Sequence, residues 1–294
     1  ASGALALAIV QVLARGMTSP LREMAAAARA MARGDYSRRV TATSRDEVGE
    51  LARAFNAMAA ELAETDRIRR DLVANVSHEL RTPITALRAI LENLVDGVEP
   101  PDPGTLKTMH AQVERLGRLV DQLLDLSRLE SGTVPLERRG FEVAPLLEQA
   151  AEESRLHAER GLERRIRLTV DVEPTDLRVY GDPERVHQVI ANLLENAVRH
   201  SPEDGRVDVT ARDGGGTVRI EVADQGPGIP DGDADRIFER FYRADPARSS
   251  RDGGTGLGLA IARWIVDLHG GDIHVERNEP RGCRMVVALP GGTG

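Results

Sequence analysis

The sequence predicts a multidomain chain of the α and α/β classes, in which coiled-coil helices and a dimeric four-helix bundle precede an α/β sandwich. Three observations lead to this prediction. Apolar residues recur at steps of three and four through most of the first 130 residues, as they do in packed helices. Beyond a break at residues 131–135, helices alternate with short apolar strands. Aromatic residues are only 3% of the 294 residues, and cores of Leu, Val, Ile and Ala suit helical bundles.

Charge and cysteine content exclude some classes of protein. The chain has 39 basic and 47 acidic residues, a net charge of -8, and no dominant basic stripe, which argues against a nucleic-acid binder. Its one cysteine, Cys283, cannot form an internal disulfide. A reducing, cytoplasmic setting fits this.

The first residues are apolar and are followed by basic ones. Residues 4–14 fall short of the ~20 apolar residues that cross a bilayer, and Arg15 and Arg22 come next, as on the cytoplasmic side of a membrane helix. We therefore expect residues 1–16 to be the end of a truncated transmembrane helix. The alternative is the start of a buried amphipathic helix.

Two short heptad helices come next. The first starts near Pro20 and should end at Gly34, and the second is capped by Asp46. An extended connector, residues 35–45, joins them. Neither helix can bury its apolar seam alone, so we expect a dimer. A plain coiled-coil spacer would show the same pattern.

The second helix continues without a breaker into a segment that carries an exposed histidine. His78 lies off the apolar seam formed by residues such as Val76 and Leu80, so its imidazole should project into solvent. Thr82 lies on the same face one turn later. Pro83 lacks an N–H, and we expect the helix to bend or loosen there. Taken alone, His78 would more often be an ordinary surface histidine.

A Pro- and Gly-rich turn at residues 97–104 separates this helix from a partner helix. In the partner, apolar residues from Leu106 to Leu123 again step by three and four. The two helices should form a hairpin, and two hairpins should form a four-helix bundle.

The remaining chain should form a mixed sheet with helices on one side. Asp182 is placed to cap a helix that begins at Pro183. The predicted helices are 141–160, 183–200 and 257–269, and the predicted strands are 165–172, 178–180, 206–212, 217–223, 273–277 and 284–289.

Polar groups suited to a nucleotide occur at two places in this part. Asn192, Asn196 and Arg199 share one helix face, where an amide oxygen suits Mg²⁺ and a guanidinium can offset phosphate charge. Asp224 ends a strand and is followed by Gly226 and Gly228. A carboxylate there can accept a hydrogen bond from an exocyclic amine such as that of adenine.

A third segment, Gly253 to Gly258, leads into a helix whose free N–H groups can face an anion. It is not a P-loop, because no Lys-Ser/Thr follows the glycines, nor a dinucleotide fingerprint, because the third glycine would fall on Leu259. Residues 245–253 are polar, as a mobile lid over a nucleotide would be.

These segments resemble motifs of known families. Pro20 and the helix start at residues 46–49 resemble a HAMP signalling module, although the heptads alone indicate only coiled-coil packing. The segments that resemble the H, N, G1, G2 and F boxes of a sensor histidine kinase are 77–83, 192–200, 224–229, 253–258 and 238–243. The domains that this resemblance implies are a HAMP domain at 17–66, a dimerisation and histidine phosphotransfer domain at 67–132, and a catalytic ATP-binding domain at 133–294.

The resemblance also implies roles for individual residues. His78 would accept the phosphoryl group, Glu79 would take or orient the proton on its other ring nitrogen, and Thr82 would position a water for removing phosphate from a partner. Asn196 would bind Mg²⁺, and Asp224 would read the adenine of ATP. The other residues expected at the nucleotide are Asn192, Arg199, His200, Gly226, Gly228, Arg243, Gly254, Thr255, Gly256, Leu257 and Gly258.

By the same resemblance, the protein is a homodimer at the cytoplasmic face of the membrane, driven by an upstream transmembrane sensor segment. It would pass its phosphoryl group to the receiver domain of a separate response regulator. One alternative is an ATPase like gyrase and Hsp90, where a glutamate activates water at the position of Asn192; Glu195, one turn away, leaves this open. The other is a catalytically inactive signalling relay.

Overall fold

The computed structural model describes residues 2–41, 46–98, 100–130, 136–159, 165–243 and 255–292. The chain forms two compact units, residues 1–78 and 79–294, and each has its own internal packing. The polar segment 245–253, predicted to be a lid, and Gly254 lie outside the described residues.

In the first unit, helix α1 (Ser2–Met31) is followed by a connector that the next helix holds in place. Gly34 has a φ of 88°, which suits the end of a helix. Val40 is buried, and the side chain of Asn56 bonds both its N–H (2.9 Å) and its carbonyl (2.8 Å). No helix among the described residues combines the length and apolar character needed to cross a membrane.

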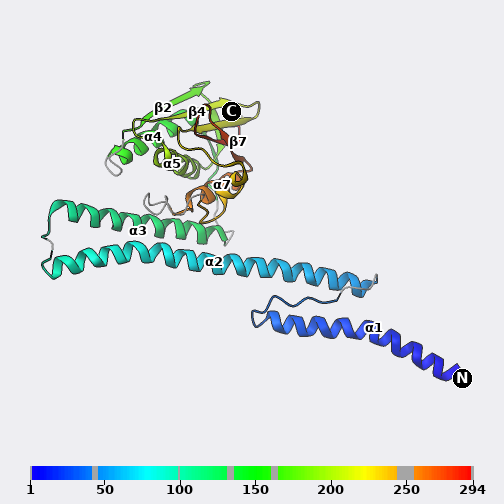
Figure 1. Cartoon of the computed structure of the whole chain (residues 1–294). Helices are drawn as coiled ribbons and strands as arrows, with labels where there is room; N and C mark the ends of the chain where they lie inside the picture. The colour runs from blue at the N-terminus through cyan, green and yellow to red at the C-terminus, as the bar shows by residue number, and fades with distance from the viewer. Residues whose placement is uncertain are drawn as a thin grey trace. The chain divides into compact units, whose positions relative to one another are not determined.

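Helix α2 (Glu47–Val95) is one long, unbroken helix (Figure 1), and Pro83 lies inside it. The Asp46 carboxylate accepts the N–H of Gly49 at 3.0 Å, which confirms the predicted cap. Helix α3 (Pro103–Glu130) starts at residue 103, so it includes the last two residues of the predicted turn. The reason is the side chain of Asp102, which accepts the N–H of Gly104 (2.6 Å) and therefore caps the helix.

The chain beyond residue 136 forms a five-stranded mixed sheet and a small two-stranded one. The order of the large sheet is β2-β4-β5-β7-β6, and only β2 and β4 are parallel. The small sheet pairs β1 with β3, so Phe141 lies in a strand and not, as predicted, in a helix. The strands are β1 Arg139–Glu142, β2 Arg167–Glu173, β3 Arg178–Gly181, β4 Arg206–Asp213, β5 Thr217–Ala223, β6 Asp272–Arg277 and β7 Cys283–Pro290.

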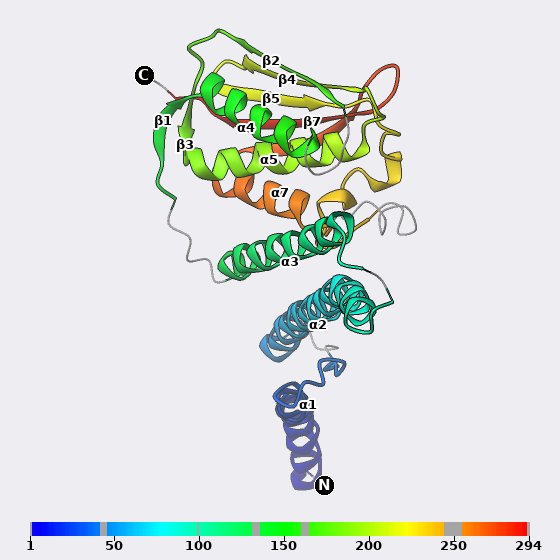
Figure 2. The same ribbon diagram turned by 90° about the vertical axis from the view of Figure 1, so that its left-hand side faces the viewer.

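Three helices cover one face of the large sheet: α4 (Val143–His157), α5 (Pro183–His200) and α7 (Gly258–Leu268) (Figure 2). Alternate residues of β4 and β5 are buried against them. Short 3-10 turns, Asp231–Asp233 and Arg236–Phe238, connect β5 towards α7. The predicted class, helical segments followed by an α/β sandwich, is confirmed.

Candidate functional site

The histidine of the helical segment is accessible. His78 and Thr82 are both exposed on α2, as the heptad pattern predicted. The next residue, Glu79, has a side chain only 12% exposed. Its two carboxylate oxygens lie 3.1 Å from Nη1 of Arg243 and 3.4 Å from Nη2 of Arg115. A predicted phosphate-lining residue is thus bonded to the carboxylate that follows His78.

Helix α5 presents a polar face because its other face is in the core. Asp182 fixes its start, since Oδ1 accepts the N–H groups of Glu184 (3.1 Å) and Arg185 (3.2 Å). Leu193 and Leu194 are fully buried. The neighbouring polar residues Asn192 and Asn196 are only half-buried. The residues on the half-buried face include Asn192, Glu195, Asn196 and Arg199.

Asn192 lies against the start of α7. A Cβ placed on Gly258 would be 3.6 Å from its Oδ1, while its buried Nδ2 has no hydrogen-bond partner among the described residues. A buried amide nitrogen without a partner is costly, and a ligand oxygen would satisfy it. The first N–H groups of α7 are next to it, and such groups favour an anion.

The strand end at Asp224 also meets α5. Asp224 is 2% exposed, and its Oδ1 accepts the N–H of Gly226 at 2.7 Å. A Cβ on Gly226 would lie 2.8 Å from the carbonyl oxygen of His200, so the two segments touch there. Gly228 has a φ of 79°, a conformation that glycine adopts without strain.

The second glycine segment is tied to the segment that resembles an F box. The N–H of Phe241 donates to the carbonyl of Gly256 (2.8 Å), and Gly256 has a φ of 69°. Thr255 donates its hydroxyl to Gln122 of α3 at 2.7 Å. The Leu257 side chain is fully buried, so only its backbone can face a ligand. The structure therefore brings together four of the predicted segments around α5 and the start of α7.

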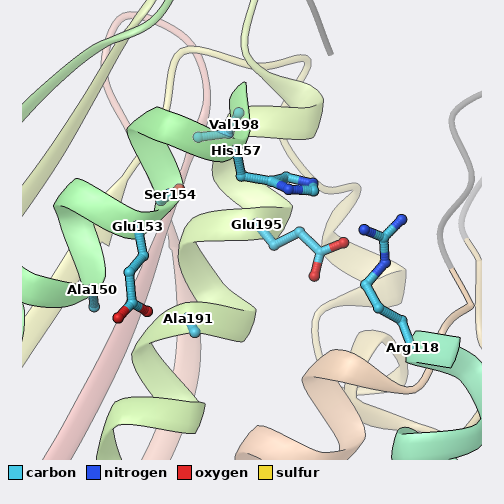
Figure 3. A pocket seen from close by; sticks show the side chains of 8 residues that line it. All are labelled: Arg118, Ala150, Glu153, Ser154, His157, Ala191, Glu195 and Val198. Carbon is cyan, nitrogen blue, oxygen red and sulfur yellow. The ribbon is translucent and has the colours of Figure 1, made fainter. Parts of the chain in front are cut away.

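A separate cavity of about 290 Å³ lies between α4 and α5. Figure 3 shows Glu195 of α5 and Arg118 of α3 extending toward each other at its edge. Among the described residues that line it, none is Asn192, Asn196 or Asp224, so this cavity is distinct from the region around Asn192. Glu195 is also paired with Arg199.

The sequence predicted strands β6 and β7, but not the contacts that the hairpin between them makes with Asp224. Asn278 donates its amide to the carbonyl of Asp224 at 2.7 Å, and the Cys283 thiol donates to the Asp224 carboxylate at 2.8 Å. These contacts span more than fifty residues of sequence, and no motif within the hairpin signals them. Arg115 and Gln122 of α3 were missed for the same reason.

The residues present fit a nucleotide and a hard cation. Phosphates need hydrogen-bond donors, and the unpartnered amide of Asn192 and the backbone at Gly256 and Gly258 can supply them. The amine of a base needs an acceptor, and the buried carboxylate of Asp224 is one. The amide oxygen of half-buried Asn196 is of the ligand type that Mg²⁺ prefers. The described residues contain no group of three His, Cys, Asp or Glu side chains that could hold a metal on their own.

Three family models match the chain in sequence order. Residues 12–64 match the HAMP domain, and residues 68–132 match the His Kinase A (phospho-acceptor) domain. Residues 181–293 match the Histidine kinase-, DNA gyrase B-, and HSP90-like ATPase.

Full-length relatives and solved structures agree with these matches. The chain is 39% identical over 280 residues, 95% of its length, to the signal transduction histidine-protein kinase BaeS of Escherichia coli, of which it covers 59%. It is 37% identical over 235 residues, 78% of its length, to the sensor histidine kinase WalK of Bacillus subtilis, of which it covers 38%. The chain thus spans about three fifths or less of these relatives.

Among solved structures, the histidine kinase AdeS of Acinetobacter baumannii is 29% identical with a TM-score of 0.60; the match covers 74% of this chain and 98% of that one. The histidine kinase ThkA, solved in complex with the response regulator protein TrrA, is 28% identical with a TM-score of 0.62; the match covers 78% of this chain and 64% of that one. With its HAMP, phosphoacceptor and ATPase-type domains in this order, the chain belongs to the sensor histidine kinases.

Proposed function

We propose that this chain is an ATP-dependent protein histidine kinase that phosphorylates His78 and passes the phosphoryl group to an aspartate of a response regulator. The observation that carries the proposal is the meeting of α5, the Asp224 segment and the start of α7 around the unpartnered amide of Asn192. The exposure of His78 supports the second half of it, because an acceptor must be reached by both ATP and the regulator.

Within the proposal, the α/β domain binds both ends of the ATP molecule, the adenine and the phosphates. Asp224 accepts the exocyclic amine of adenine, and the backbone at the start of α7 faces the phosphates. Asn196 would hold Mg²⁺, which would offset the negative charge of the phosphate oxygens. Arg199 and Asn192 border the same region of α5. His200, Gly228 and Gly254 are assigned to this site by the family resemblance.

Transfer is an in-line displacement at the γ-phosphorus. A neutral ring nitrogen of His78 forms the N–P bond while the P–O bond to ADP breaks, and the proton of the other ring nitrogen passes to Glu79. Arg243 donates to the Glu79 carboxylate at 3.1 Å. To bind the phosphates it must therefore break this hydrogen bond during the cycle. Thr82, exposed on the same helix, positions water for the reverse removal of phosphate from the regulator. One relative is named a kinase/phosphatase, MprB of Mycolicibacterium smegmatis, which supports this second activity.

The proposal includes domain bounds, partners and location. We assign residues 17–66 to HAMP, 67–132 to the phosphotransfer domain and 133–294 to the ATP-binding domain. The protein acts as a homodimer, and the regulator bound in the ThkA structure supports a receiver domain as partner. The apolar residues 4–14, followed by Arg15, support a place at the cytoplasmic face of a membrane, under an upstream sensor segment.

One observation disfavours the ATPase alternative. Hydrolysis needs a carboxylate that activates water near the γ-phosphate, and Asn192 cannot act as a base. Glu195, the remaining candidate on α5, is paired with Arg199 and lines the α4–α5 cavity instead. Transfer to a side chain is therefore the reaction that these residues support.

Incubation of the purified chain with radiolabelled Mg-ATP tests the proposal. We expect protein-bound phosphate that is stable to base and labile to acid, as phosphohistidine is. Free phosphate without labelled protein would indicate the ATPase, and neither product would indicate the relay. Either of these results would overturn the kinase assignment.

A further inference from the structure

The Asp224 carboxylate is held by donors from two segments, and one of them is a thiol. Its Oδ1 accepts the N–H groups of Gly226 (2.7 Å) and Cys283 (3.2 Å), and its Oδ2 accepts the Cys283 thiol at 2.8 Å. A carboxylate has about four lone pairs, so these three bonds leave Oδ2 able to accept one more donor. Asp224 is 2% exposed, so its charge depends on these bonds more than on water.

The hairpin between β6 and β7 fixes the thiol in this place. Asn278 donates to the Asp224 carbonyl (2.7 Å), and the N–H of Asp224 donates to the carbonyl of Cys283 (2.9 Å). A Cβ on Gly282 would lie 1.9 Å from the Asp224 carbonyl oxygen, so the backbones could not approach this closely with any other residue at 282. These backbone contacts hold the thiol within 2.8 Å of Oδ2.

The thiol stays protonated, which it must do in order to donate. Burial, with added effects from the Asp224 charge and from their hydrogen bond, raises the pKa of the Cys283 thiol far above its ordinary value. A thiolate beside the carboxylate would put two negative charges in contact in a buried place. The same burial makes Cys283 unreactive toward oxidants and electrophiles.

We propose that Cys283 is a positioning residue that holds the Asp224 carboxylate oriented toward the amine of the base, and so helps to set the preference for adenine. The inference rests on the proposed nucleotide site and adds a residue that no part of the nucleotide need touch. An ionised carboxylate accepts from an amine and repels a ring carbonyl; a protonated one can donate to the carbonyl and loses this discrimination.

Removal of the thiol should therefore change how binding depends on pH. The hydrogen bond from the thiol favours the ionised form of the carboxyl group, so its loss removes part of that stabilisation. Binding of an adenine nucleotide needs the ionised form, and its affinity should then start to fall at a higher pH than in the wild type. Among the described groups near Asp224, Asn278 on the hairpin is neutral, and Arg284 on β7, which donates to Asn278, stays charged. His200 at the end of α5 is present in every variant, so any effect of this residue cancels from the comparison.

The test measures ADP and inosine diphosphate binding to the whole chain by calorimetry, with Mg²⁺, at a series of pH values from neutral down to about pH 5.5. Inosine carries a carbonyl in place of the adenine amine. For Cys283→Ala and the near-isosteric Cys283→Val, we expect ADP affinity about 3- to 10-fold weaker at neutral pH. At low pH the loss should grow, and the ratio of ADP to inosine diphosphate affinity should approach one.

Two matched variants separate positioning from packing. Cys283→Ser returns a donor and should restore the wild-type pH profile and base preference. Val287→Ala removes a fully buried side chain from the same strand without touching Asp224, and should lower stability but leave the pH profile as it is.

Three results would overturn the inference. The Ala and Val variants could keep the wild-type profile, or Cys283→Ser could shift it as far as they do, which would make the role one of packing. If the wild type itself bound ADP without preference over inosine diphosphate, the assignment of Asp224 in the proposed function would fail with it. A wild type that discriminates, with variants that also do, would overturn this inference alone.

Discussion

The helical region, residues 18–130, and the α/β domain, residues 139–290, differ in where their large apolar side chains lie. In the helical region many remain exposed, among them Val73 (61%) and Val113 (57%). In the α/β domain the only exposed large apolar side chains among the described residues are Leu156 and Tyr180. Most of the buried apolar residues lie in the α/β domain, on α5, α7 and the central strands.

This difference indicates which part can fold by itself. Helices with one apolar seam cannot bury it within a single hairpin. A row of exposed large apolar side chains marks a surface that contacts another chain. The mixed sheet with α4, α5 and α7 covers its own core. We therefore expect the region that carries His78 to depend on a second chain, and the α/β domain to fold without one.

The largest effect should come from the acceptor. We expect His78→Gln to lose all base-stable phosphate label, because the amide cannot form the N–P bond. ADP binding, which belongs to the α/β domain, should stay unchanged. His110→Gln is a matched control, since His110 is an exposed histidine on α3, and it should keep the label. Label on the His78 variant would contradict the assignment.

The contrast in apolar exposure predicts where a charge breaks the dimer. Leu91→Glu places a carboxylate on the exposed seam of α2 (46% exposed), and burying it between two chains would be costly. We expect sedimentation to show a monomer. Tyr180→Glu, at an equally exposed position of the α/β domain, should stay dimeric. A dimeric Leu91 variant would mean that the seam is not the interface.

Truncation of an apolar side chain should lower stability more in the α/β domain than in the helical region. Leu193 is fully buried under the sheet, and Leu193→Ala should cost about 2–5 kcal/mol of unfolding free energy. Val98, 71% exposed in the turn after α2, should change stability by less than about 0.5 kcal/mol when replaced by Ala. Trp264 is the one tryptophan and lies in α7, so its fluorescence in urea follows the α/β domain. Equal losses would mean that this domain is not the independently stable part.

Binding can be separated from stability within α5. Asn196 is half-buried on the face away from the core, so Asn196→Ala should leave the urea midpoint close to wild type. We expect its affinity for Mg-ADP to fall about tenfold or more, because a neutral oxygen ligand is lost. Asn93→Ala, on the exposed surface of α2, is the control and should bind normally. Unchanged affinity in the Asn196 variant would remove it from the metal site.

Local signals account for what the sequence could predict. Helix α5 begins and ends where expected because its cap, Asp182, and its apolar period act within a few residues. Strand β1 was missed because Phe141 is its only apolar residue, too little for an alternating pattern. The bond between Glu79 and Arg243 joins residues 164 positions apart, and the thiol contact of Asp224 joins residues 59 apart. Such contacts follow from tertiary packing, so the motifs located the site but not the residues that hold its side chains.

The smallest predicted effect compares the caps of the two regions. Asp182 is 5% exposed and caps α5 in the core, and Asp182→Ala should cost about 1–2 kcal/mol. Asp102 caps α3 at an exposed position, and Asp102→Ala should cost less stability than Asp182→Ala because water can replace its hydrogen bonds.

Hydrogen bonds from Thr105, first its N–H and then its hydroxyl, lower the pKa of Asp102 below 3.8. A lowered folded pKa means that this contribution is present above about pH 3.8 and is lost as the pH falls through the lower value, so the Asp102 cap is intact at pH 7. Urea unfolding at pH 7, followed by far-ultraviolet dichroism for α3 and by Trp264 for α5, measures both; a larger loss at Asp102 would mean that the helical region relies on its caps more than the self-contained domain does.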